Sequence, residues 1–143
     1  MSGLKFDKRE LGNLEYSLDR EMLATDRRGG YMSTTIVCCN TRKYHGLMVA
    51  PIDQSERTYV LLSSLDETLI QHDQAFNLAL HRFNGIYEPR GHKYITDFEY
   101  TPTPTITYRV GGAVLRKELL WIHKRTQLMI RYTLLDAHSE TTL

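Results

Sequence analysis

Short runs in which apolar and polar residues alternate with a period of two dominate the sequence beyond Thr25. In the clearest run the apolar side of the alternation carries Leu128, Ile130, Tyr132 and Leu134. Because successive side chains of a β-strand point to opposite faces, this spacing predicts a strand with one buried face. Turn residues interrupt the pattern about every ten positions, which favours many short antiparallel strands.

The pattern predicts nine strands, over 31–39, 44–51, 58–63, 67–71, 76–80, 94–100, 105–110, 113–123 and 128–134. Gly111 and Gly112 predict a tight hairpin between two of them, since glycine adopts positive φ angles without strain. Thr101–Pro104 is expected to be a loop or edge segment, because its two prolines cannot donate backbone hydrogen bonds. Without intervening long helices, such a set implies two packed sheets or a barrel. We predict an all-β fold, an antiparallel two-sheet β-sandwich of the supersandwich type with about nine or more strands.

The segment before Thr25 is ambiguous. Leu11, Leu14, Leu18 and Met22 follow helical spacing, whereas a glycine and an asparagine at positions 12 and 13 would weaken a helix there. The sequence therefore does not assign a secondary structure to this region.

Composition limits the classes of partner. The 143 residues fit one domain, 1–143, and 18 basic against 17 acidic residues leave a formal charge of +1, too little to attract nucleic acid or an anionic membrane. The charged start and the absence of about 18 consecutive apolar residues argue against a signal peptide or membrane span. We therefore expect a cytoplasmic protein, with no nucleic acid and no membrane as partner.

The two cysteines and the last residues support two further expectations. Cys38 and Cys39 are adjacent, so they are predicted to be free thiols that act as small buried apolar side chains. Turn chemistry at 136–140 is followed by only three residues, too few for a returning strand. We expect the natural chain to continue; a short frayed tail is the alternative.

No catalytic machinery is predicted within the chain. Glycosidic hydrolysis needs two carboxyl groups, and the candidate pairs here, Asp97 with Glu99 and Asp66 with Glu67, are most simply solvated positions. The six histidines are scattered without metal-ligand spacing, so neither a metal nor another cofactor is expected.

Aromatic residues can serve as platforms for sugar rings, and their positions separate two groups. Tyr108 and Tyr132 alternate with apolar strand residues and are expected in the core, whereas Trp121 fits either role. Tyr44 and Tyr87 lie next to loop residues and are the better candidates for exposed contacts.

The most distinctive run is Asn-Thr-Arg-Lys-Tyr-His-Gly-Leu-Met-Val at 40–49. It places Arg42, Tyr44 and His45 at the junction of a turn and a strand, where rigid backbone holds accessible side chains. The forked guanidinium of Arg42 suits a carboxylate or sugar hydroxyls. The alternative is a solvated turn in which Tyr44 and His45 cap the sheet edge.

This run resembles the amino-terminal domain of bacterial and archaeal glycogen debranching enzymes, the amylo-α-1,6-glucosidase group. Residues 21–33 and 61–68 resemble further segments of that domain, in the same order and at similar spacing. Two departures stand out: Met22 replaces the usual tryptophan, and residues 26–28 differ from the family's Asn-Gly-Leu type of turn.

Members of that family place such a β-sandwich before a catalytic barrel of paired helices, which hydrolyses α-1,6 branch points in glycogen. The resemblance implies a non-catalytic domain whose partners are the catalytic domain of the same chain and α-glucan. The residues expected to face the barrel or its glucan cleft are Gly29, Gly30, Tyr31, Asn40, Arg42, Tyr44 and His45. A stand-alone glucan-binding module is the alternative, and an unrelated structural sandwich is a weaker third.

Overall fold

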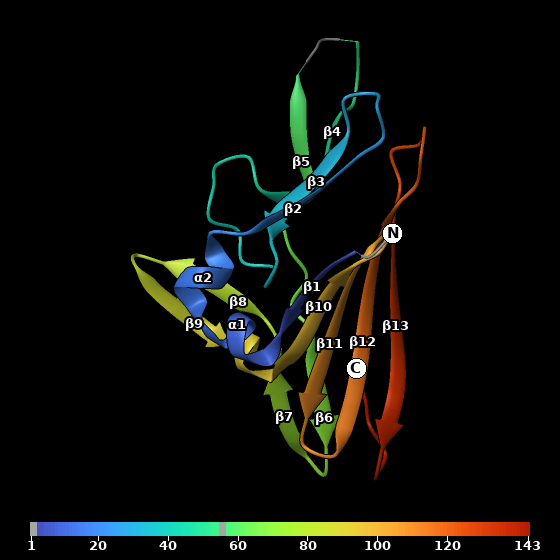
Figure 1. Ribbon diagram of the computed structural model, residues 1–143. Helices are drawn as coiled ribbons and strands as arrows, with labels where there is room; N and C mark the ends of the chain where they lie inside the picture. Colours follow the sequence, from blue (N-terminus) through green and yellow to red (C-terminus); the bar gives the residue numbers. More distant parts are fainter. Residues whose placement is uncertain (1–2, 55–56) are drawn as a thin grey trace.

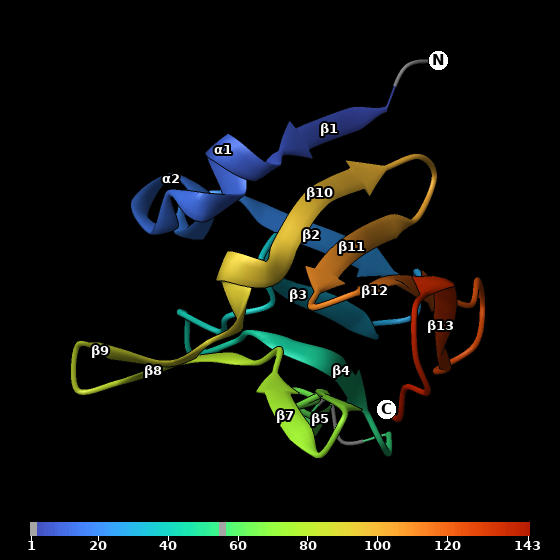
Figure 2. The same ribbon diagram turned by 90° about the horizontal axis from the view of Figure 1, so that it is seen from below.

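The chain forms two antiparallel sheets that share one hydrophobic core (Figures 1 and 2). The computed structural model describes residues 3–54 and 57–143. One sheet has the strand order β1-β10-β11-β12-β13: Leu4–Asp7, Ile95–Tyr100, Pro104–Val110, Ala113–Trp121 and Leu128–Ala137. The other has the order β2-β3-β4-β5: Glu21–Thr25, Tyr31–Thr35, Gly46–Pro51 and Thr58–Leu62. The predicted all-β sandwich is confirmed.

The core forms where the inward faces of the two sheets meet. On β11, Ile106, Tyr108 and Val110 are buried, as their alternation predicted, and Gly111 turns the chain into β12 with φ +56°. The other sheet contributes Met22, Met32 and Leu47 to the same cluster. Burial of Tyr108 and Trp121 and partial burial of Tyr132 place all three aromatic side chains at this core or its rim.

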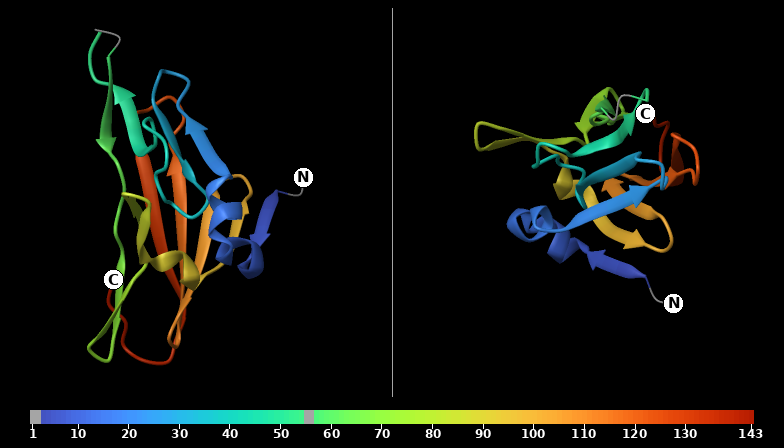
Figure 3. Two further views of the ribbon diagram at one scale, coloured as in Figure 1. Left: turned by 90° about the vertical axis from the view of Figure 1, so that its left-hand side faces the viewer. Right: turned by 90° about the horizontal axis from the view of Figure 1, so that it is seen from above.

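Two hairpins extend from the sheets. β6 (Thr68–Gln71) pairs with β7 (Gln74–Asn77), and β8 (Leu80–Phe83) pairs with β9 (Ile86–Arg90). Their turns, at His72–Asp73 and Asn84–Gly85, each have two successive residues of positive φ, which match the right-handed twist of paired strands. The predicted strand over 76–80 is thus two strands, and η1 (Gly91–Tyr94) precedes β10. The β8–β9 hairpin lies on the same side of the molecule as the helices (Figure 3).

The ambiguous amino-terminal segment contains two short helices, α1 (Lys8–Gly12) and α2 (Leu14–Leu18). Asn13 separates them with an extended backbone, and its side chain accepts a hydrogen bond from the Tyr16 N–H at 3.1 Å, which caps α2. Met22 belongs to β2, so the helical spacing does not extend that far.

Several predicted boundaries and one predicted burial were wrong. The strand from Tyr31 ends at Thr35, because Thr35 Oγ1 accepts the Cys39 N–H at 3.0 Å and Cys38 adopts φ +59°. Tyr44 lies in a turn, and β4 begins at Gly46. Leu134 was expected in the core, but it lies on β13, the edge strand of its sheet, and is 47% exposed.

Both cysteines are free thiols, with Cys39 buried and Cys38 partly buried. Burial raises the pKa of both, that of Cys39 to about 11. Such thiols are poor nucleophiles at neutral pH, in keeping with the predicted packing role. In the part of the chain that the structure describes, no helix is long and apolar enough to cross a membrane.

Candidate functional site

His45 organises the turn that joins β3 to β4. The ring is buried, and its Nδ1 accepts the backbone N–H groups of Thr41 at 3.0 Å and Arg42 at 3.3 Å. These two donors assign the proton of the neutral ring to Nε2. Nε2 lies 3.2 Å from Glu21 Oε1 at the start of β2, although the geometry is not that of a hydrogen bond. His45 therefore fixes the shape of the turn from within.

Arg42 and Tyr44 project from this turn towards solvent. The Arg42 guanidinium forms an ion pair through Nε with Glu21, and the Arg42 side chain remains 72% exposed. Tyr44 is 69% exposed, and its backbone carbonyl accepts a hydrogen bond from the Tyr31 hydroxyl at 3.1 Å. A rigid turn thus presents a cation and an aromatic ring next to each other.

These side chains line a shallow hollow of about 380 Å³ on the outer face of the β2–β5 sheet. We call it the outer-face hollow; its residues are Glu21, Leu23, Tyr31, Ser33, Arg42, Tyr44 and His45. Of the seven residues predicted for the site, four meet here, namely Tyr31, Arg42, Tyr44 and His45. Glu21 and Leu23 were missed, although their spacing of two places both on one face of β2.

The other three predicted residues hold the backbone instead. Gly29 adopts φ +94° in the β2–β3 turn, where buried Asp26 accepts the Gly30 N–H at 3.0 Å. Asn40 accepts the Thr34 hydroxyl at 2.8 Å and donates to the Ser63 carbonyl at 3.0 Å, which ties β3 to the chain after β5.

The structure contradicts the expectation that the Glu67 carboxylate is solvated. It is buried, with Oε1 lying 2.5 Å from both Lys117 Nζ and the Tyr132 hydroxyl, which donates to it. Burial alone would lower the pKa of Lys117, but the nearby Cys38 and the Glu67 carboxylate raise it on balance. A carboxylate held this way cannot serve as a mobile proton donor to a substrate.

The remaining carboxylates form no catalytic arrangement among the described residues. Asp66 is exposed and lies 2.7 Å from His81 Nε2, while Asp97 is partly buried and Glu99 is exposed on β10. Within residues 3–54 and 57–143, no group of three or more histidine, cysteine or acidic side chains is arranged to hold a metal ion.

The fold and the outer-face hollow define the class of protein as an antiparallel β-sandwich domain with a motif-bearing turn at the face of one sheet. The family model described as glycogen debranching enzyme N terminal matches residues 20–143. The match covers most of the chain, so the protein belongs to this family. No curated protein and no solved structure matches significantly. The match excludes β1, α1 and α2.

Proposed function

We propose that this chain is the non-catalytic amino-terminal domain of an amylo-α-1,6-glucosidase. In this proposal the outer-face hollow meets the catalytic barrel of the same chain or the rim of its α-glucan cleft. Membership in the debranching-enzyme amino-terminal family carries the proposal. The whole enzyme would hydrolyse α-1,6 branch points in glycogen, and it would act in the cytoplasm.

The chemistry of the outer-face hollow supports this role. Leu23 is 60% and Tyr44 69% exposed, so the hollow presents an apolar and an aromatic side chain to solvent. Arg42 retains guanidinium donors beyond the one directed at Glu21. An apolar surface beside forked donors suits either a protein interface or the faces and hydroxyls of a sugar chain.

The test replaces both Arg42 and Tyr44 by alanine in the full-length enzyme. We expect branch-point hydrolysis or glucan affinity to fall about tenfold, or the melting temperature to drop, because a central cation and aromatic anchor are lost. Lys5→Ala is the control, since Lys5 is exposed on β1 and does not line the hollow. Unchanged hydrolysis, affinity and stability in the double variant would reject the proposal.

A further inference from the structure

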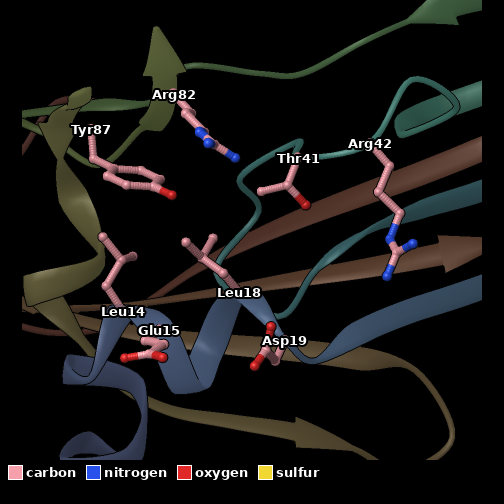
Figure 4. A pocket seen from close by; sticks show the side chains of 8 residues that line it. All are labelled: Leu14, Glu15, Leu18, Asp19, Thr41, Arg42, Arg82 and Tyr87. Atoms are coloured by element: carbon pink, nitrogen blue, oxygen red, sulfur yellow. The ribbon is translucent and has the colours of Figure 1, made fainter. Parts of the chain in front are cut away.

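A second pocket lies on the other side of Arg42, between α2 and the β8–β9 hairpin (Figure 4). Its volume is about 510 Å³, within the range of small-ligand sites. We call it the α2 pocket; it is lined by Leu14, Glu15, Leu18, Asp19, Thr41, Arg42, Arg82 and Tyr87. Because α2 precedes the region matched by the family model, part of this pocket belongs to sequence outside that match.

The walls of the α2 pocket are built by elements already held in place. The Asn13 cap starts α2, and the helix presents two carboxylates, Glu15 and Asp19, towards the pocket. Arg82 and Tyr87 are directly opposed on β8 and β9, so they share one face of the hairpin, with Arg82 Cζ 5.9 Å from the Tyr87 ring centroid.

Several polar groups at this pocket have no hydrogen-bond or ion-pair partner among the described residues. The side chains of Glu15 and Asp19 form no ion pair or hydrogen bond there, and neither does that of Arg82, whose guanidinium lies over the Tyr87 ring. The pocket therefore offers acceptors on the helix wall and donors on the hairpin wall (Figure 4).

This arrangement favours a neutral polyhydroxylated ligand. The positive charge of Arg42 is balanced by the Glu21 carboxylate. The remaining charges in the lining are one cation, Arg82, and two carboxylates. The pocket therefore does not attract phosphate or another anion. A sugar hydroxyl both donates and accepts, so one sugar ring satisfies both walls. The apolar side chains of Leu14, Leu18 and Tyr87 lie between them and can contact the C–H groups of the ring.

We propose that the α2 pocket binds a glucose unit of an α-glucan chain. Naming glucan as the sugar rests on the proposed function, whereas the preference for a neutral sugar rests on the pocket itself. Arg42 lines both the α2 pocket and the outer-face hollow, so the two are neighbouring parts of one surface. A glucan chain held in the α2 pocket would extend past Arg42 towards Tyr44.

The test is hydrogen–deuterium exchange of the full-length protein titrated with maltoheptaose. Protection is expected in residues 13–19 and 80–90, and Arg82→Ala or Asp19→Ala should raise the half-maximal sugar concentration for that protection about tenfold, since a charge-assisted hydrogen bond is lost. Arg90→Ala is the matched control, because Arg90 is exposed on the same hairpin and does not line the pocket.

Two results would overturn the α2 pocket as a sugar site. One is no protection of either segment by maltoheptaose; the other is protection that both pocket variants retain at unchanged concentration, with wild-type melting temperatures. Equal protection by inorganic phosphate would also contradict it. Unchanged hydrolysis, glucan affinity and stability in the Arg42 and Tyr44 double variant would instead refute the role proposed for the outer-face hollow. The two proposals can therefore be rejected separately.

Discussion

Lys117 is a charged residue buried in the core of the sandwich. It is 1% exposed on β12, on the inward row between Leu115 and Leu119, and its ammonium meets the Glu67 carboxylate at 2.5 Å. Desolvation of both ions offsets much of their attraction, so the intact pair contributes little net stability. Removing one partner is different, since the other charge stays buried.

We expect Lys117→Met to lower the free energy of unfolding by roughly 3–5 kcal/mol, measured by urea denaturation. In this variant Glu67 keeps only the Tyr132 hydroxyl. The control is the double variant Lys117→Met, Glu67→Leu, which should recover much of the loss because no charge remains buried. A single variant as stable as the wild type would show that the pair is not desolvated.

The β2–β3 hairpin depends on a clamp in its turn. Asp26 is fully buried and its Oδ1 accepts the N–H groups of Arg28 at 2.7 Å and Gly30 at 3.0 Å. A Cβ on Gly30 would lie 2.3 Å from Asp26 Oδ2 and 3.2 Å from Trp121. The β2–β3 turn and the Asp26 hydrogen bonds that hold it therefore require glycine at position 30.

Gly30→Ala is expected to destabilise the protein by about 1–3 kcal/mol, because Asp26 must move and its buried hydrogen bonds weaken. Gly12→Ala is the comparison: nothing lies within 4 Å of its added Cβ, and alanine favours α1 by up to about 1 kcal/mol. Thermal melts should show a lower melting temperature for the Gly30→Ala variant than for the Gly12→Ala variant. Equal melting temperatures would mean that the turn relaxes without cost.

At the scale of the whole molecule, the cysteine, tyrosine and lysine side chains of the core make the fold sensitive to alkaline pH. Burial raises the pKa of Cys39 from 9.0 to about 11 and raises those of Tyr108 and Tyr132, and the net pKa of Lys117 is also raised. A group whose pKa is higher in the folded than in the unfolded protein stabilises the fold fully at pH values below its unfolded-state pKa. That contribution is lost as the pH rises through the pKa of the folded state.

We therefore expect the urea midpoint to stay level between about pH 7 and 9 and to fall progressively above that range, where these groups ionise more readily in the unfolded chain. Cys39→Ala should flatten the decline between pH 9 and 11, irrespective of any constant loss from the smaller side chain. Parallel declines in the two proteins would assign the alkaline sensitivity elsewhere.

Local patterns in the sequence were sufficient for the class of fold and for part of the site. Alternation identified the buried rows of β11 and β12, and the predicted hairpin turn between them is present, with Gly111 at positive φ. The 40–49 run identified Arg42, Tyr44 and His45, three residues of the outer-face hollow. These features succeed because side-chain direction in a strand and backbone strain in a turn depend on neighbouring residues.

Tertiary structure alone decided the rest. The meeting of Glu67 with Lys117 and the approach of Arg82 to α2 each join residues far apart in the chain. The periodicity of the sequence does not predict such pairings, because they depend on how the two sheets and the hairpins pack. The sequence by itself determined which faces are apolar and which turns are tight; only the packing of those faces determined which polar groups are buried together and which remain free around a pocket.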